Sequence, residues 1–588
     1  MRMTAVVLVL LVVPARAQDA PPGNDGPPAP TAPGTADTPW TADRFGVQIP
    51  MRDGKSLAAD VHLPAKAGRY PAIVVQTPYD RTKVRAGLAI AQGGLVVGGE
   101  TISGVADREH YAYVVADWRG FFGSRAAGAG ARPGALGQDG YDVVEWTAAQ
   151  AWCDGKVGTW GPSALGVVQF QTAAERPPHL VCSVPLVASY GYRYDDYFAD
   201  GVLREHHVAC LDRLGFGTGA RIREARDPSG ALYRLARLAE RPAAIDVPML
   251  LITGWFDHGT ERQIDTFNTL LAEGGPAARA GSRLLIGPWH HTAVDAAAQG
   301  DLQFPLAAGE AGLAAVAWFD KWLRGVGNGG WADGERVRFW RINQDGYHRA
   351  ATWPRPGGVA KTLTLHATGV IDDKPARADE APRSFLDDPA DAVPTLGGAN
   401  LPLFGLLPGP RDQKPLLARS DVLVYTTDGL VAPIRLEGAA TMTVSVRLDA
   451  PDTDVAVRLC QVLDDGRAML LADGIARASY AAPGGAGGAP RAGSATGPLG
   501  AAAPAATRVL LESGEPREVT VRLPPLAVTF PVGARIRLIV SGTNSPRFER
   551  NSHTGADAFD AKWAVASKVE ILHDAAHPAR IVLPLALP

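Results

Sequence analysis

Short, unbroken apolar runs recur between about residues 43 and 350, and each run ends in polar or turn residues. Such runs are typical of strands that are buried on both faces of a parallel sheet. Between them lie stretches with helical spacing, such as DGYDVVEW, where Asp139 is placed to cap the helix. This alternation predicts a doubly wound α/β fold. The runs are YPAIVVQTPYD, YAYVVADWRG, GKVGTWG, HLVCSVPL, VPMLLITGWFD and SRLLIGPWHH.

Residues 188–240 interrupt this pattern with an aromatic and charged stretch that has helical spacing and no strand run. We expect this stretch to form a helical cap on an α/β domain made of residues 43–187 and 241–350. From residue 351 onward apolar and polar residues alternate, as in ATMTVSVRLDA and PREVTVRL. Alternation with period two indicates antiparallel strands with one solvent-exposed face, so residues 351–588 are predicted to form an all-β jelly roll. A low-complexity loop, residues 482–507, interrupts it.

The first residues have the pattern of a secretory signal. An apolar run follows Arg2, and Ala15 and Ala17 form a small-residue cleavage site, so residues 1–17 are interpreted as a signal peptide. Residues 18–42 are rich in Pro and Gly and are predicted to be a disordered linker. We therefore expect a periplasmic or secreted protein. No other apolar run reaches the roughly 18 residues of a membrane span, so no membrane association is expected after cleavage.

Length and composition narrow the class of protein further. A chain of 588 residues exceeds one hydrophobic core, so two or three domains are expected. Its 58 basic and 61 acidic residues give a formal net charge of −3, which argues against a nucleic-acid partner. The four cysteines are too few for a disulfide framework. Cys153 and Cys182 lie on runs expected to be neighbouring strands; small buried thiols are favoured, and a disulfide stays open.

One serine lies where a reactive residue would be expected. In KVGTWGPSALGVVQF, Ser163 separates a predicted strand from a predicted helix, with Gly161 before it and Gly166 after it. A nucleophilic serine in an α/β-hydrolase occupies such a turn between small residues, because the backbone there is strained. The second glycine is one place later than in the usual G-x-S-x-G pattern, so the motif alone is weak.

Residues at other strand ends strengthen this interpretation. Asp257 ends one apolar run, and the pair His290 and His291 follows another. Serine, aspartate and histidine in this order match the triad order of an α/β-hydrolase. Tyr79 also ends a run, and its hydroxyl and the Ala164 N–H are candidate oxyanion donors. Each residue also has an ordinary structural explanation: a helix cap, a loop histidine or a buried ring.

The motifs TPYDR, ADWRGFFGS, QDGYDVVEW, KVGTWGPSALG, GWFDH and GPWHH resemble, in this order, those of the CocE/NonD family of serine hydrolases. This family is related to the α-amino acid ester hydrolases and the X-Pro dipeptidyl peptidases. LDAPDTDVAVRL and SPRFERNSHTG are similar to motifs of its C-terminal jelly roll. The resemblance implies an α/β-hydrolase fold with Ser163 as nucleophile, Asp257 as acid, His291 rather than His290 as base, and Tyr79 as an oxyanion donor.

The chain between Ser163 and Asp257 is short for this family, which implies a trimmed cap and a more open pocket. YDDYFADGVLR is similar to an Asp-Asp motif of the amino acid ester hydrolases, but the segment DHGT lacks the further carboxylates that hold a substrate ammonium in those enzymes. A lone carboxylate of the cap is more often a solvated charge. The candidate substrate-binding residues are Trp160, Tyr190, Asp195, Asp196 and Phe256.

The sequence thus predicts an exported serine hydrolase that cleaves esters, or amides, of small acyl substrates through an acyl-enzyme. Two alternatives stay open: a hydrolase, acylase or X-Pro-type peptidase for amine-bearing substrates, and a non-catalytic binding protein. Whether the chain is a homo-oligomer is also open. No cofactor or metal is expected, because the adjacent His206 and His207 of the cap point in different directions on a helix.

Overall fold

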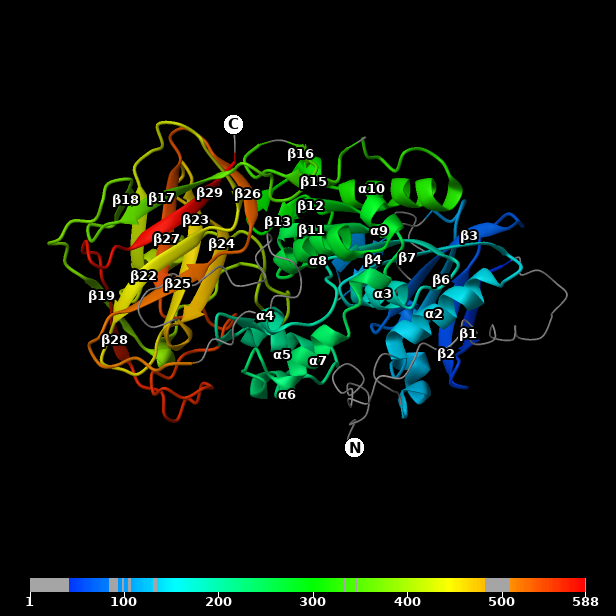
Figure 1. Ribbon diagram of the computed structural model, residues 1–588, viewed down its shortest axis with the longest axis horizontal. Helices are drawn as coiled ribbons and strands as arrows, with labels where there is room; N and C mark the ends of the chain where they lie inside the picture. Colours follow the sequence, from blue (N-terminus) through cyan, green and yellow to red (C-terminus); the bar gives the residue numbers. More distant parts are fainter. Residues whose placement is uncertain are drawn as a thin grey trace.

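The computed structural model describes residues 42–83, 94–97, 100–103, 107–130, 135–332, 334–344, 346–481 and 508–586. The expected signal peptide, nearly all of the expected linker and the low-complexity loop lie outside these residues. An α/β domain and an all-β domain lie side by side, and the cap helices lie at the junction between them (Figure 1). The predicted fold class is confirmed.

The α/β domain is built on one ten-stranded sheet. All six apolar runs form strands of it, and these strands pair in parallel with their neighbours β3–β6, β3–β7, β7–β8, β8–β11 and β11–β12. Antiparallel pairs lie only at the two edges. In spatial order the strands are β1 (Arg44–Pro50), β2 (Ser56–His62), β6 (Ala112–Asp117), β3 (Tyr70–Thr77), β7 (Cys153–Pro162), β8 (Leu180–Leu186), β11 (Leu250–Phe256), β12 (Arg283–His290), β15 (Val337–Trp340) and β16 (Tyr347–Ala350).

Helices cover both faces of this sheet. On β7, a Cβ at Gly158 would touch Phe319, whereas the neighbouring Thr159 hydroxyl contacts Gln169 of α3. Since successive strand residues point to opposite faces, α3 and α10 lie on opposite sides, as a doubly wound fold requires. The helical segments are η2 (Phe122–Gly128), α2 (Ala135–Ala148), α3 (Ala164–Ala174), α8 (Thr260–Glu273), α9 (Pro276–Gly281), η4 (Pro305–Ala307), α10 (Glu310–Phe319) and the π-helix η5 (Asp320–Arg324).

Asp139 does not cap its helix, so that prediction is wrong. Helix α2 begins at Ala135, and Asp139 lies inside it. Its buried carboxylate accepts hydrogen bonds from Arg119 at 2.8 and 2.5 Å. The pattern predicts an acidic residue at the start of the helix but carries no information about a distant arginine.

The cap between β8 and β11 has a small core of its own. Tyr194 stacks on Phe198 with ring centroids 4.5 Å apart, and Tyr233 meets Tyr194 edge-on. The cap also contains a two-stranded hairpin, β9 with β10, that the helical spacing did not reveal. Its elements are α4 (Tyr194–Tyr197), β9 (Phe198–Ala199), β10 (Val202–Leu203), α5 (Glu205–Arg213), α6 (Gly219–Glu224) and α7 (Ala231–Leu238), followed by η3 (Pro242–Ala244).

The described residues of the all-β domain form thirteen strands, paired antiparallel except β18 with β20. Outer strands such as β19 and β25 show the expected alternation, but β23 and β24 are buried along their whole length because other elements, including the cap hairpin, pack on them. The strands are β17 (Val359–Leu365), β18 (Val370–Asp372), β19 (Arg383–Asp387), β20 (Leu423–Thr427), β21 (Ile434–Gly438), β22 (Thr441–Arg447), β23 (Asp454–Val462), β24 (Ala468–Arg477), β25 (Arg517–Arg522), β26 (Leu526–Phe530), β27 (Arg535–Ser541), β28 (Ser567–Ile571) and β29 (Arg580–Leu585).

Smaller elements complete the chain. Two further hairpins are β4 with β5 and β13 with β14. Short 3-10 turns, η6, η7 and η8, connect strands of the all-β domain. The remaining bounds are β4 (Gly94–Val97), β5 (Glu100–Ser103), β13 (Ala298–Gln299), β14 (Leu302–Gln303), η6 (Pro389–Asp391), η7 (Lys414–Ala418) and η8 (Ala478–Tyr480).

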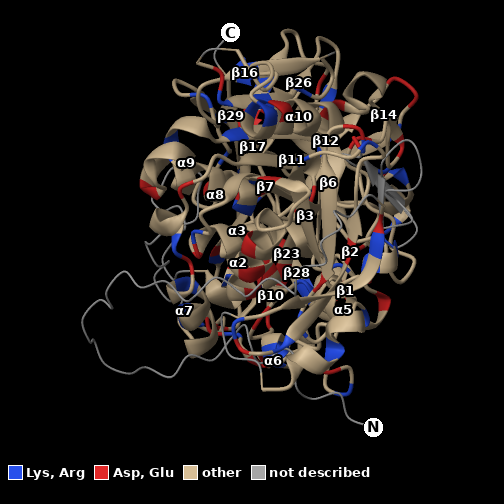
Figure 2. Ribbon diagram, turned by 90° about the vertical axis from the view of Figure 1, so that its right-hand side faces the viewer, with Lys and Arg blue, Asp and Glu red and all other residues tan. Residues whose placement is uncertain are grey.

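Cysteine placement and surface charge agree with the composition. All four cysteines are buried free thiols, including Cys153 and Cys182. Figure 2 shows Lys and Arg interspersed with Asp and Glu. Within the part of the chain that the structure describes, no helix combines the length and hydropathy needed to cross a bilayer.

A buried ion pair joins the cap to the all-β domain. Arg226 of the cap donates two hydrogen bonds of 2.7 Å to the Glu549 carboxylate, which also accepts the Leu203 N–H. Burial alone raises the pKa of Glu549, but the hydrogen bonds from Arg226 and the charge of Arg477 outweigh it and hold the pKa below its usual range. The pair therefore stabilises the junction while Glu549 is ionised.

Replacing this carboxylate should loosen the junction. We expect Glu549→Ala to lower the free energy of unfolding by about 3–5 kcal/mol, because the substitution leaves the Arg226 guanidinium without its carboxylate partner. Since the folded-state pKa is depressed, the contribution of Glu549 is present above its unfolded-state pKa and is lost as the pH falls through the folded-state pKa. Urea denaturation of the full chain at neutral and acidic pH measures both effects.

Glu518→Ala is the matched control. Glu518 pairs with Arg580 at 3.4 Å in a partly exposed position, and such pairs contribute only about 0–1 kcal/mol. Equal losses in the two variants would contradict a stabilising role for the Arg226–Glu549 pair.

Candidate active site

Ser163 occupies a strained turn between β7 and α3. Its backbone has φ 55° and ψ −125°, a conformation that a non-glycine residue rarely adopts. Gly161 has φ +150°, and a Cβ there would lie 2.5 Å from the Leu165 Cβ. A Cβ at Gly166 would lie 2.5 Å from the Ala188 Cβ. Both glycines are therefore required for the turn, including the one that departs from the usual spacing.

Asp257 and His291 meet at the carboxyl ends of two neighbouring strands. Phe256 pairs in register with His290 on the parallel strands β11 and β12, so the residues that follow lie side by side. His291 Nδ1 lies 2.7 Å from Asp257 Oδ1. The other Asp257 oxygen accepts the Gly259 N–H at 3.1 Å, and the carboxylate is fully buried. A buried carboxylate in this position holds one tautomer of the imidazole.

The neighbouring histidine has a different environment. The His290 N–H donates to Gln299 Oε1 at 2.8 Å, and its Nδ1 lies 3.5 Å from the Thr292 hydroxyl. Burial lowers the pKa of His290 to about 4, so its imidazole is neutral near pH 7. Of the two histidines that the sequence pattern left open, the structure brings His291 to the aspartate.

Tyr79 and Ala164 lie beside the serine. Burial raises the pKa of Tyr79 to about 12, although hydrogen bonds with the Ser163 side chain and the Ala164 N–H lower it. The phenol therefore keeps its proton near neutral pH and remains a hydrogen-bond donor. Both candidate oxyanion donors thus lie within reach of the same serine.

A cavity of about 260 Å³ opens above these residues. Ser163, Tyr79, Ala164 and His291 all line it. The α/β domain, the cap and residues 401–403 of the all-β domain contribute its walls, which are mainly apolar. Apolar wall residues include Trp118, Leu136, Leu211, Phe216, Ile222 and Leu403.

The two candidate carboxylates of the cap differ in position. Asp196 lines the cavity, but one oxygen accepts the Arg193 N–H at 2.7 Å and the other lies 3.4 Å from Arg262 Nε. Arg262 is buried, so it compensates the charge of Asp196 directly. Asp195 is exposed and is not part of the cavity wall.

The other three candidate substrate-binding residues lie in the core rather than in the cavity wall, which corrects the expectation from sequence. Trp160 is buried on β7 and Phe256 on β11. Tyr190 stacks on Phe170, and its hydroxyl accepts the Arg241 N–H at 2.8 Å. Proximity in sequence to a reactive residue does not set the direction of a side chain, because neighbouring strand residues point to opposite faces.

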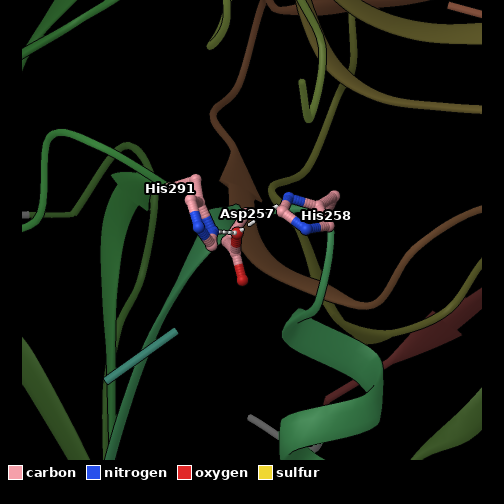
Figure 3. A group of neighbouring side chains, drawn as sticks. All are labelled: Asp257, His258 and His291. Atoms are coloured by element: carbon pink, nitrogen blue, oxygen red, sulfur yellow. Dashed lines mark hydrogen bonds and ion pairs between the residues drawn. The ribbon is translucent and has the colours of Figure 1, made fainter. Parts of the chain in front are cut away.

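Two histidines that the sequence analysis did not assign also line the cavity. The His258 ring centroid lies 4.5 Å from that of His207 and 4.6 Å from that of His291. His258 directly follows Asp257, and its Nδ1 lies 3.3 Å from Asp257 Oδ1 (Figure 3). As expected for adjacent helical residues, His206 points elsewhere, with its Nε2 2.9 Å from the Leu403 carbonyl oxygen. The one feature of the sequence that could have placed His258 at the cavity is its position directly after Asp257.

Family models match two parts of the chain. Residues 53–241 match the X-Pro dipeptidyl-peptidase (S15 family), and residues 329–582 match the X-Pro dipeptidyl-peptidase C-terminal non-catalytic domain. The first match includes Tyr79 and Ser163, whereas Asp257 and His291 follow it.

Comparison with whole proteins extends the likeness over nearly the full length. A cocaine esterase from Rhodococcus sp. (strain MB1 Bresler) is 30% identical over 604 residues, which cover 92% of this chain and 98% of that protein. An aminopeptidase from a marine sediment Thaumarchaeota archaeon has a similar structure, with a TM-score of 0.75, 20% identity and coverage of 97% and 100%. The structure of an α-amino acid ester hydrolase is also similar, with a TM-score of 0.74 and 21% identity; the match covers 95% of this chain and 100% of that one. At these identities the two structures show a shared fold.

Proposed function

Because the chain belongs to the CocE/NonD family of serine hydrolases, which includes cocaine esterase and is related to the X-Pro dipeptidyl peptidases, we propose that it is an exported carboxylesterase for uncharged, apolar acyl groups. One observation carries the proposal: His291, which is hydrogen-bonded to Asp257, lines the same apolar cavity as the strained Ser163.

In the proposed acylation step, His291 takes the proton of the Ser163 hydroxyl as its oxygen attacks the ester carbonyl carbon. A serine hydroxyl is a poor nucleophile without such a base. Asp257 accepts the Nδ1–H of His291, which leaves Nε2 as the base and stabilises the imidazolium that forms. The tetrahedral oxyanion accepts hydrogen bonds from the Tyr79 hydroxyl and the Ala164 N–H.

The oxyanion then collapses, and the bond to the leaving alcohol breaks as His291 returns its proton to the alcohol oxygen. Water, deprotonated by His291, attacks the acyl-enzyme and releases the acid and free Ser163. No step in this sequence consumes a cofactor.

The charges around the cavity support a preference for uncharged acyl groups. An ammonium group taken out of water requires a carboxylate partner. Asp196 already neutralises Arg262 and accepts a backbone N–H, and Asp195 lies outside the cavity wall. A substrate ammonium would therefore compete with a buried guanidinium for the same carboxylate, whereas an apolar acyl group gains from the apolar walls.

Removing the Tyr79 hydroxyl tests the assignment of the oxyanion donor. We expect Tyr79→Phe to lower kcat by about 10²–10³-fold with little change in KM, because the hydrogen bond strengthens only as charge develops on the carbonyl oxygen. Steady-state hydrolysis of a p-nitrophenyl ester provides the measurement. Tyr70→Phe, which removes an exposed hydroxyl bonded to the Lys66 carbonyl, should leave kcat unchanged. An unchanged kcat in Tyr79→Phe would remove Tyr79 from the mechanism.

A matched pair of substrates tests the acyl preference. We expect a phenylacetyl ester to be hydrolysed with a kcat/KM at least about tenfold higher than its α-amino counterpart, a difference of about 1.4 kcal/mol. Ser163→Ala supplies the blank and should abolish both activities. If the amino ester is the better substrate and Asp196→Asn removes that advantage, the enzyme is instead a hydrolase for amine-bearing substrates.

Export is part of the same proposal and rests on the N-terminal sequence pattern. N-terminal sequencing of the protein recovered from the periplasm or medium of producing cells should begin at Gln18. Recovery of the unprocessed chain from the cytosol alone would refute export.

A further inference from the structure

The Asp257 carboxylate lies between two imidazoles (Figure 3). Its Oδ1 lies 2.7 Å from His291 Nδ1 and 3.3 Å from His258 Nδ1. One ligand atom from each of the three residues lies within 4.8 Å of the others. Only one of these imidazoles is needed for the proposed esterase chemistry.

The second imidazole has an unused nitrogen. His258 Nδ1 is buried and makes no hydrogen bond with other described residues, and the same holds for Nδ1 of the neighbouring His207. Such buried polar atoms are uncommon, because an unmade hydrogen bond costs free energy. The orphaned nitrogen faces the triad carboxylate at the wall of an accessible cavity.

We propose that Asp257, His258 and His291 form a binding site for a divalent zinc ion, and that zinc occupancy reversibly inhibits the enzyme. Two imidazole nitrogens and one carboxylate oxygen suit zinc, which binds three protein ligands and keeps the fourth position for water in open sites. The cavity supplies the entry path and the room for that water. The inhibition, though not the binding, rests on the proposed catalytic role of His291.

Zinc binding rearranges one proton of His291. The metal forms a bond to Nδ1, the hydrogen bond from Nδ1 to Asp257 breaks, and the proton moves to Nε2. The imidazole stays neutral, but the nitrogen that would accept the Ser163 proton is now occupied. The serine therefore loses its base. The Asp257 carboxylate binds in its ionised form, so the step consumes no oxidant or reductant.

Charge and burial around the site set the expected affinity. A zinc ion binds imidazole nitrogen in its neutral form and carboxylate in its ionised form. The positive charges of Arg204 and Arg547 act on His258, and they oppose a bound cation. We therefore expect micromolar rather than nanomolar binding.

Calorimetric titration of the metal-stripped full-length protein with zinc chloride tests the binding directly. The wild type should bind a single zinc ion, and His258→Gln should weaken this binding at least about tenfold. His179→Gln is the matched control, because it removes an exposed histidine that pairs with Glu145 outside the cavity. The control should bind zinc as the wild type does.

A second variant keeps the test decisive. His291→Gln should also lose the site, so the result does not depend on the folding of one variant. Calorimetry reports binding whether or not the esterase proposal holds, which separates the two. Binding of equal affinity in the wild type, His258→Gln and His291→Gln would place zinc elsewhere and overturn the proposal.

The effect on catalysis follows in a rate measurement. Zinc should inhibit ester hydrolysis by the wild type, and a chelator should restore the rate in full. His258→Gln, compared with its own zinc-free rate, should require at least about tenfold more zinc for the same inhibition. Zinc that binds without inhibiting would overturn the inhibitory role.

Discussion

Parallel pairing of β11 with β12 is the constraint on which the rest of the site depends. Residues that follow parallel strands in register lie together at the carboxyl ends of those strands. This brings Asp257 and His291 together although 34 positions separate them in the chain. Because β7 runs parallel in the same sheet, Ser163 also lies at the carboxyl end of its strand. The helices on both faces keep these strands buried, so their polar residues can face a cavity where the strands end.

The cap and the all-β domain turn these strand ends into an enclosed pocket. Cap helices supply apolar walls, while the Arg226–Glu549 pair holds the cap against its neighbour. The same enclosure sets the charge at the cavity wall, because Asp196 forms an ion pair with Arg262. It also leaves Nδ1 of His258 buried beside the Asp257 carboxylate, without a hydrogen bond to any other described residue. The compensated charge of Asp196 and the grouping of His207 with His258 thus both depend on how the cap packs over the cavity.

The strands of the α/β sheet, and the positions of Ser163, Asp257 and His291 at the ends of such strands, could be predicted from sequence because each has a local signal. Buried parallel strands are continuous apolar runs, and Ser163 lies between glycines that a strained turn requires. Side-chain direction has no such signal, so Trp160 and Phe256 were expected in the cavity and lie in the core. Asp139 was predicted to cap its helix but lies inside it, where its carboxylate pairs with Arg119, a residue 20 positions away. The burial of β23 and the cavity position of His258 likewise depend on contacts between segments far apart in the chain.

The contact of residues 401–403 with the cavity has a consequence for how substrate range can change. These residues lie within the range matched by the C-terminal domain model, and the Leu403 carbonyl oxygen lies 2.9 Å from Nε2 of His206 in the cap. A graft that moved the α/β domain alone onto another scaffold would carry Ser163, Asp257 and His291 but lose one wall of the pocket. Variation in the all-β domain can therefore reshape the pocket without any change at Ser163, Asp257 or His291.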